Sequence, residues 1–311
     1  MPKLDGGGFG TAFGYQIDKK NDTVGFEDSS HTYFDLTDGS KYISATQLIH
    51  KYLPPFDSNF WSSYKACEAI LGSDFYELKK LLLSTKTWKD SYLKEYKIDV
   101  DEFNNKKAEI LQSYKEKNRE ACEHGTKVHD LMENLFYKKD EKRLKTFGLG
   151  GTIDVEKGRY KLDKERAVYP EIMLSYKFDD YLKTVGQADL VIKDGDEISI
   201  YDWKTSKSID KESYFDKNTK KRETMKFPLN DLMASNYWSY SLQLSLYMYM
   251  IQKMHPKFKC RKLALIHIDR EFNETEYECP YLKDEVERML LHYRKENKKK
   301  VLLEKDKPIV W

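Results

Sequence analysis

The sequence predicts an α/β protein in which a helical first half precedes a second half of strands and helices. From residue 57 to residue 137, apolar residues recur at spacings of three and four among abundant Lys and Glu, without a proline. That periodicity is typical of amphipathic helices. From Ala167 onward the pattern changes to short β-like runs, then one strongly apolar helix and further strands. With 311 residues, the chain can form one large domain or two smaller ones.

The first half begins with residues 1–22, which are rich in Gly and polar residues and are predicted to form a flexible arm. The strands predicted next are Val24–Phe26, His31–Leu36 and Lys41–Ile43. Ser44 is a typical N-cap for a helix that Pro54 then ends. The long helical stretch has two predicted breaks, at Gly72–Asp74 and at Ile98-Asp99.

The second half starts after a charged, glycine-containing connection at 138–165, which is expected to face solvent. The elements predicted after it are strands Ala167–Tyr176, Val185–Lys193 and Glu197–Thr205, a loop at 206–229, a helix Leu232–Met254, strands Lys262–Asp269 and Thr275–Cys279, and a helix Tyr281–Asn297. An Asp194-Gly195 turn is expected to join the second and third strands as a hairpin.

Composition excludes several classes of protein. Lys plus Arg number 54 and Asp plus Glu number 52, so the net charge of +2 excludes a polycation, and any nucleic-acid site must be a local patch. Aromatic residues make up 14% of the chain, which argues against disorder. No apolar run is long enough to cross a membrane, the N-terminus lacks a secretory signal, and the four cysteines are dispersed. We therefore expect an intracellular protein, not secreted and not membrane-bound.

The most informative motif is Gly186-Gln187-Ala188-Asp189, followed thirteen residues later by Asp202-Trp203-Lys204. Side chains alternate along a strand, so Asp202 and Lys204 should share one face while Trp203 faces the core. A turn at Asp194-Gly195 would place Asp189 opposite position 200, and therefore diagonal to Asp202.

Two neighbouring carboxylates repel each other unless a cation or a proton separates them. Mg²⁺ or Mn²⁺ suits oxygen ligands, and Lys204 could then orient a water for attack on a phosphodiester. The alternative is that Asp202 and Lys204 form an ordinary surface pair. The apolar residues around the motif and the preceding acid favour the functional interpretation.

These residues resemble motifs II and III of the PD-(D/E)XK nuclease superfamily, and further pieces follow in the order of its RecB-type branch. His129 lies in a GTxxH-like element, Glu171 resembles motif I, and Gln243 with Tyr247 resembles the QxxxY of a later helix. The resemblance covers residues 120 to 270 and is nearest to mitochondrial genome maintenance exonucleases and to phage or viral exonucleases.

The resemblance implies a PD-(D/E)XK core at 124–311, a central mixed sheet flanked by helices, with an N-terminal β-hairpin and helical extension at 23–123. It implies a Mg²⁺- or Mn²⁺-dependent DNA exonuclease, acting at duplex ends or on single strands, with roles in DNA replication, repair or recombination and protein partners from those processes. The metal ligands would be His129, Asp189, Asp202 and the Trp203 carbonyl. The catalytic set would be Lys204, Asp202 and Asp189, with Glu171, Gln243 and Tyr247 in support.

Each supporting residue also has an ordinary structural interpretation. His129 could be a packing residue, Glu171 a plain strand carboxylate, and Gln243 with Tyr247 the edge of the core. Tyr237 and Trp238 could stack on unpaired bases or pack in the core. The basic loop 206–229, with Lys207, Lys220, Lys221 and Arg222, could contact phosphates or merely keep the loop soluble. The helical region 57–123 would close over the site, as in similar exonucleases.

Two other functions remain open from the sequence. One is a structure-specific endonuclease, and the other is a non-catalytic module that binds DNA ends and keeps the nuclease fold. Some RecB-like relatives carry a four-cysteine iron–sulfur cluster. Cys260 and Cys279 stand nineteen residues apart with no third cysteine beyond them, so no such cluster is expected here.

Overall fold

The computed structural model describes residues 24–27, 30, 32–149, 153–156, 162, 164–216 and 220–305. The arm predicted at residues 1–22 lies outside these residues. The chain divides into two compact units. The sheet unit contains the residues up to Leu53 with 126–214 and 222–311, and the helical unit contains Pro54–Gly125 with Phe215–Lys221. Among the described residues, no helix is both long and apolar enough to cross a membrane.

The helical unit has both predicted breaks, and a further break at residues 86–90 that was not predicted. Its elements are α2 (Ser58–Leu71), the 3₁₀ helix η1 (Gly72–Phe75), α3 (Tyr76–Thr85), α4 (Ser91–Glu95) and the first part of α5 (Val100–Tyr137). Gly72 ends α2 with a φ of 52°, a conformation that glycine adopts without the steric cost of a Cβ. The rings of Trp88 and Phe103 stack with centroids 5.0 Å apart, next to the buried Leu78 and Leu82.

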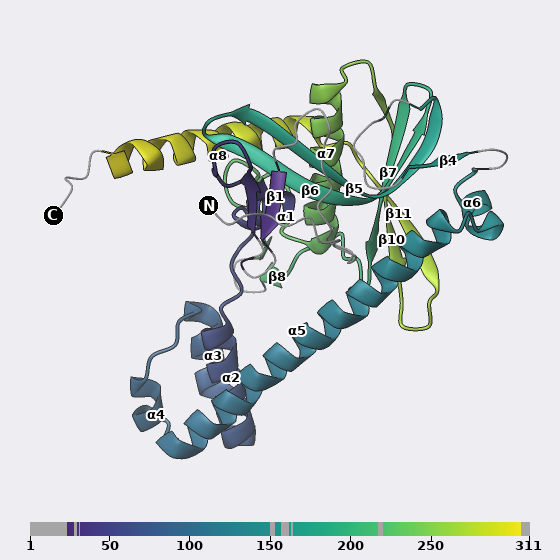
Figure 1. Ribbon diagram of the computed structural model, residues 1–311. Helices are drawn as coiled ribbons and strands as arrows, with labels where there is room; N and C mark the ends of the chain where they lie inside the picture. The colour runs from purple at the N-terminus through teal and green to yellow at the C-terminus, as the bar shows by residue number, and fades with distance from the viewer. Residues whose placement is uncertain are drawn as a thin grey trace. The chain divides into compact units, whose positions relative to one another are not determined.

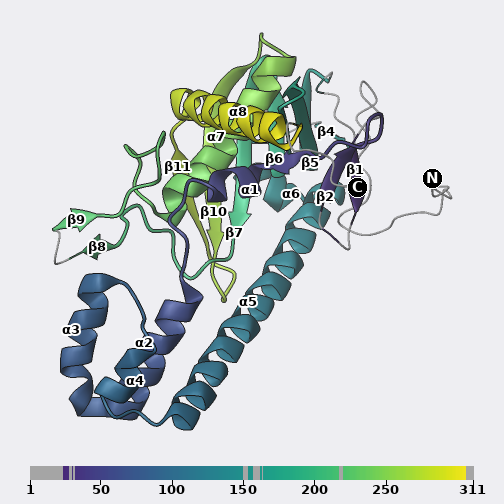
Figure 2. The same cartoon turned by 90° about the vertical axis from the view of Figure 1, so that its left-hand side faces the viewer.

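The sheet unit is built around a mixed, curled sheet flanked by helices (Figures 1 and 2). Its strands are β3 (Ile43–Ser44), β4 (Asp154–Val155), β5 (Arg166–Asp179), β6 (Leu182–Asp194), β7 (Glu197–Lys204), β10 (Lys259–Ile268) and β11 (Glu274–Cys279). Their order is β11-β10-β7-β6-β5-β4, and β3 pairs with β6. The central pairs β5–β6 and β6–β7 are antiparallel, whereas β10 runs parallel to β7.

Two layers of helix cover this sheet. On one face, Val128, Met132 and Phe136 from the end of α5 pack with Trp203 on β7, next to α6 (Glu141–Thr146). On the other face lie α1 (Ala45–His50), α7 (Asn236–Met254) and α8 (Lys283–Lys305), whose apolar side chains form the larger core. The expected central mixed sheet flanked by helices is therefore confirmed, with the helix of His129 on one face and α7 on the other.

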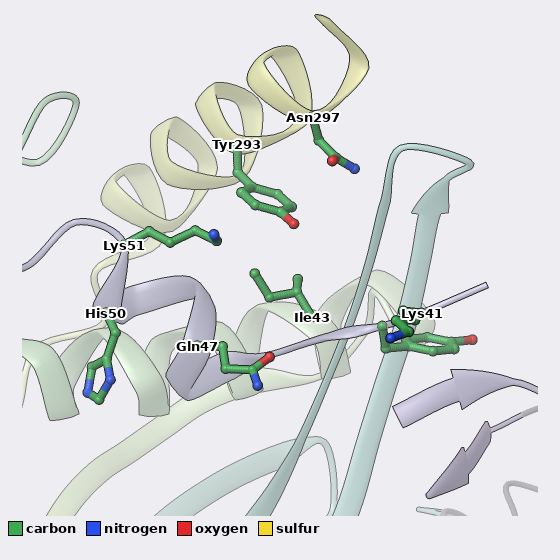
Figure 3. A pocket seen from close by; sticks show the side chains of 8 residues that line it. Lys41, Ile43, Gln47, His50, Lys51, Tyr293 and Asn297 are labelled. Atoms are coloured by element: carbon green, nitrogen blue, oxygen red, sulfur yellow. The ribbon is translucent and has the colours of Figure 1, made fainter. Parts of the chain in front are cut away.

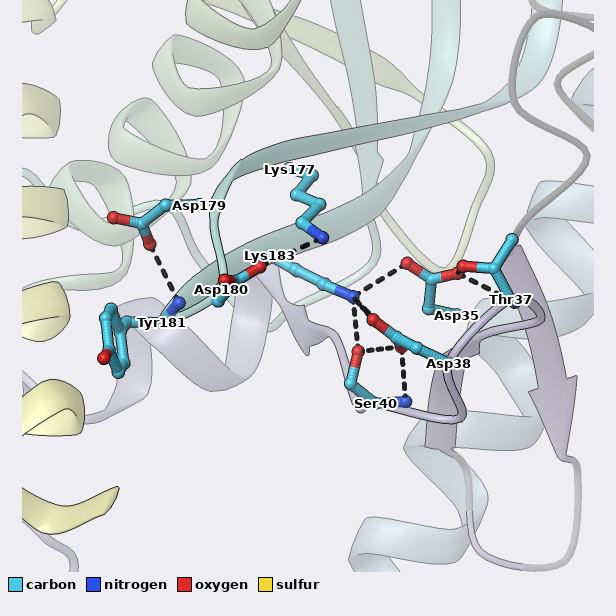
Figure 4. Close-up of polar contacts among 9 residues, drawn as sticks. All are labelled: Asp35, Thr37, Asp38, Ser40, Lys177, Asp179, Asp180, Tyr181 and Lys183. Atoms are coloured by element: carbon cyan, nitrogen blue, oxygen red, sulfur yellow. Dashed lines mark hydrogen bonds and ion pairs between the residues drawn. The ribbon is translucent and has the colours of Figure 1, made fainter. Parts of the chain in front are cut away.

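The N-terminal hairpin β1 (Val24–Glu27) and β2 (Thr32–Asp35) belongs with the sheet unit. The sequence-based boundary had grouped it with the helical region. The structure differs because β3 pairs with β6, and because Lys183 on β6 is buried against Asp35 (Figure 4). The Lys183 ammonium donates to Asp35 at 2.7 Å and to Asp38 at 2.9 Å, and it also bonds Ser40. The N-cap predicted at Ser44 is present, and Gln47 completes a capping box with it.

Three other expectations differ from the structure. The connection 138–165 contains the short helix α6 and strand β4, and the loop 206–229 contains β8 (Phe215–Asp216) and β9 (Lys221–Arg222). The β6–β7 turn is formed by Gly195 and Asp196, so the register is shifted by two residues from the prediction. Gly195 has a φ of 60°, which suits the first position of a tight hairpin turn.

Candidate active site

The corrected register brings the two motif carboxylates face to face. Leu190 pairs with Tyr201, so Asp189 lies opposite position 202 and not diagonal to it. The Trp203 main-chain N–H donates a 2.6 Å hydrogen bond to Oδ2 of Asp189. Asp189 and Asp202 are 6% and 1% exposed. Two acids are thus buried side by side on neighbouring strands.

His129 adds a nitrogen ligand from the α5 side. Its Nδ1 lies 3.5 Å from Oδ1 of Asp189 and 3.4 Å from Oε1 of Glu171. One ligand atom from each of these three residues lies within 4.8 Å of the other two, which is a spacing that a single metal ion could bridge. The structure therefore brings together the His, Glu and Asp that the sequence selected.

Glu171 takes an unusual backbone conformation. It has a φ of 49° between Pro170 and Ile172, in the middle of β5. A non-glycine residue in this region costs about 1–3 kcal/mol, and such strain clusters at functional sites. Gln187 fixes the side chain, donating from Nε2 to Oε2 of Glu171 at 2.9 Å. Glu171 was expected to support the metal site, and its carboxylate lies as close to His129 as that of Asp189 does.

Lys204 and Asp202 share a face of β7, as strand alternation predicted. The Lys204 ammonium forms an ion pair with Oδ2 of Asp202 and lies 4.5 Å from the centre of the Tyr240 ring. Trp203 points to the opposite face, 1% exposed, with its ring near Phe136. The prediction that Trp203 is a core residue is confirmed. Its N–H contacts the site, and its carbonyl as a metal ligand remains a prediction.

Gln243 and Tyr247 reach the same site from α7. Gln243 Nε2 donates to the Tyr247 hydroxyl at 2.8 Å and lies 3.5 Å from Oδ1 of Asp202. Gly186 makes room for the Tyr247 ring, because a Cβ at that position would lie 2.5 Å from the ring. The QxxxY pair therefore braces Asp202, the partner of Lys204.

The electrostatics of the metal-free site favour bound protons. Burial and the Asp202 carboxylate raise the pKa of Asp189 well above its ordinary value. Burial opposes a charge on His129, but the carboxylates of Asp189 and Glu171 outweigh it and raise the pKa of His129 to about 9. Burial likewise opposes a charge on Lys204, yet Asp202 and Asp189 raise its pKa. The cluster has an excess of acids that only cations or protons can offset.

The predicted DNA-binding residues differ in how exposed they are and in whether neighbouring groups hold them. Tyr237 is 5% exposed, with its hydroxyl donating to the Glu278 carbonyl at 2.8 Å, so its proposed stacking on bases is corrected to core packing. Trp238 is half-buried and Lys207 is exposed. Arg222 is held by Glu212 at 2.5 Å and by the Ser213 carbonyl at 2.8 Å, which gives it a structural role within its loop.

Lys220 and Lys221 belong to the helical unit, and their role in binding phosphates remains a prediction.

Two site residues were missed in the sequence. Tyr240 precedes Gln243 by three residues, so helical spacing could have placed it on the same face. Gln187 precedes Asp189 by two residues and shares its strand face by alternation.

The fold and the site define an α/β protein with a buried cluster of three carboxylates, one histidine and one lysine at a mixed sheet. No family model and no curated protein matches the sequence. A structure described as "Crystal structure of SSO0001" is similar over 46% of this chain and 53% of that chain, with 18% identity and a TM-score of 0.25. The match thus spans about half of that chain.

Proposed function

We propose that the protein is a metal-dependent deoxyribonuclease of the PD-(D/E)XK type that degrades DNA from ends or within single strands. The observation that carries this proposal is the convergence of Glu171, Asp189 and Asp202 from three adjacent strands on one buried patch. His129 and Lys204 join that patch, in the arrangement that the sequence motifs imply.

A divalent cation fits the residues of this patch. Three buried carboxylates stand against one lysine and one histidine, and buried like charges are unfavourable without a counter-charge. His129, Glu171 and Asp189 would hold the ion, with Asp202 beside them. Carboxylates suit Mg²⁺, and the imidazole nitrogen additionally suits Mn²⁺. Such an ion, when bound, supplies charge stabilisation for the phosphate and lowers the pKa of a coordinated water.

The chain's own residues orient the carboxylates and the ammonium group of the site. The Trp203 N–H fixes one oxygen of Asp189, which leaves the other directed toward His129. Gln187 does the same for Glu171. Lys204 is held by Asp202 on the face of the acidic patch, where its ammonium can donate to the attacking water or to a phosphate oxygen. Preorganised donors of this kind need no rearrangement during the reaction.

DNA contacts around the site would come from several elements. Tyr240 lies against Lys204, and exposed Lys207 follows Lys204 by three residues. Trp238 would offer a partly exposed ring to an unpaired base. The proposal also includes Lys220, Lys221 and the helical region 57–123, as elements that would bind or enclose the strand. Cellular roles in replication, repair or recombination belong to the same proposal.

The test is cleavage of end-labelled linear and covalently closed circular DNA, single- and double-stranded, with Mg²⁺, Mn²⁺ or EDTA. We expect loss of the linear substrates only, only with a divalent ion, and not with Asp202→Ala. Asp196→Ala, which removes an exposed acid from the turn of the same hairpin, is the matched control and should retain activity. Cleavage of circles would instead indicate an endonuclease. Binding of ends without cleavage would indicate the non-catalytic module.

A further inference from the structure

A basic groove runs between α1 and α8 on the sheet unit, outside the candidate active site. Its first part is a hollow of about 660 Å³ between the start of α1 and the middle of α8 (Figure 3). The second part, about 500 Å³, continues over the end of α1 toward Lys226. The two parts share Lys51, Tyr293 and Asn297 in their walls, so they form one continuous surface.

The groove carries an excess of positive charge. Its walls contain four lysines and one acidic residue, Glu296; the lysines are Lys41, Lys51, Lys226 and Lys300. All four lysines are exposed, and within the described part of the chain no ion pair joins any of them to an acid. The chain as a whole is almost neutral, at +2. This local excess is the kind of patch that a polyanion requires.

Aromatic groups lie among these cations. Lys51 points toward Tyr293, with its ammonium 5.8 Å from the ring centre (Figure 3). Phe227 is 70% exposed, with its ring centroid 5.4 Å from that of His292. Interleaved cations and partly exposed rings suit a flexible nucleic-acid strand, because phosphates bind the lysines and bases can stack on rings.

The groove is connected to the candidate active site through α1 and β6. Ile43 in its wall pairs with Thr184 on β6, five residues before Asp189 on the same strand. At ~3.3–3.4 Å per residue, that separation is about 17 Å. Ala45, at the start of α1, lies against Gly186, which in turn contacts Tyr247 of the site.

We propose that this groove binds the phosphate backbone of the substrate strand at a distance from the bond that is cut. This inference rests on the proposed nuclease function. At the ~3.4 Å of axial rise per nucleotide in a stacked strand, 17 Å corresponds to about five nucleotides, and an extended single strand covers the distance with fewer. A strand of three nucleotides is therefore too short to extend from the active site into the groove, and a strand of twenty reaches it.

The test compares 5′-fluorescein-labelled (dT)3 and (dT)20 on the full chain. Binding is measured by anisotropy in EDTA, and cleavage is measured with Mn²⁺. The groove variant is Lys51→Gln with Lys226→Gln and Lys300→Gln. The matched control is Lys253→Gln with Lys257→Gln and Lys259→Gln, which removes the same charge near the start of β10. His267, which pairs with Lys204 of the site, lies near the other end of β10.

We expect the groove variant to bind (dT)20 about tenfold or more weakly at low salt, with a salt slope reduced by about two, from three contacts at ~0.7 each. Its binding and cleavage of (dT)3 should match those of the control variant. Equal losses of binding for both strand lengths, or no difference from the control variant, would overturn the groove proposal and leave the nuclease proposal intact. If the wild-type chain neither binds nor cleaves either strand, the nuclease proposal fails and the groove proposal fails with it.

Discussion

The main-chain N–H of Trp203 donates a hydrogen bond to Asp189, and this contact fixes the two acidic strands in register. It occupies Oδ2 of Asp189 and leaves Oδ1 facing His129 at 3.5 Å. The strand therefore has two functions at this position. The Trp203 side chain anchors one face of the sheet, and its backbone orients a carboxylate on the other.

This contact distinguishes two substitutions of Asp189. Asp189→Asn keeps an acceptor for the Trp203 N–H but loses the charge, so we expect a folded protein with activity lowered at least about 100-fold. That loss exceeds the 10–100-fold typical of residues that only support a ligand. Asp189→Ala should lose the same activity and also some stability, since it leaves a buried N–H without its acceptor. Steady-state cleavage and thermal unfolding check the pair, and wild-type turnover by Asp189→Asn would contradict the assigned site.

The protonation of the site predicts how stability and metal binding depend on pH. In the metal-free protein the raised pKa of His129 contributes stability that is fully present below pH 6.5 and is lost as the pH rises through about 9. The raised pKa of Asp189 acts in the same direction. The metal-free chain should therefore lose stability across this window.

Mn²⁺ competes with the proton on His129, so its apparent affinity should rise with pH over the same range, by up to tenfold per unit for one proton released. Calorimetry in buffers of different ionisation enthalpy measures that proton. His129→Ala should weaken Mn²⁺ binding and remove the proton release attributed to the imidazole. If the variant binds Mn²⁺ with unchanged affinity and pH dependence, His129 is a packing residue.

Gly186 offers a test of the support behind the site. In Gly186→Ala the new Cβ would lie 2.5 Å from Cε1 of Tyr247 and 3.2 Å from the Ala45 side chain. The Tyr247 ring must move, which should cost about 1–3 kcal/mol as overpacking and disturb the Gln243 contact with Asp202. We expect a folded protein with a reduced kcat. Gly195→Ala, in the hairpin turn, is a control that should affect stability but not the turnover of the folded fraction.

Local periodicity was enough to predict most of the elements. The alternation of Asp202, Trp203 and Lys204 and the N-cap at Ser44 depend on neighbours in the chain, and both were predicted correctly. The hairpin register was wrong because the choice between Asp194-Gly195 and Gly195-Asp196 depends on which residue takes a positive φ. The closeness of Glu171 to His129 depends on a backbone twist and on packing between distant segments, which no local pattern encodes.

Lys183 provides a prediction about the attachment of the N-terminal hairpin. Its side chain is 3% exposed and its partner Asp35 is 5% exposed, so Lys183→Met would leave a buried carboxylate without its cation (Figure 4). Breaking such a pair on one side typically costs about 3–5 kcal/mol. Lys177→Met, which removes an exposed ion pair with Asp180, should cost less than about 1 kcal/mol.

Denaturant unfolding measures both of these changes. The combined variant Lys183→Met with Asp35→Asn should regain part of the stability, because the second change removes the uncompensated charge. Burial opposes a charge on Asp35, but its hydrogen bonds to Lys183 and Thr37 outweigh burial and lower its pKa. The pair's contribution to the free energy of unfolding should therefore be complete above the ordinary carboxyl pKa near 3.8, and it should be lost as the pH falls below that value. A loss of stability from Lys183→Met no larger than that from Lys177→Met would show that this buried pair does not hold the hairpin to β6.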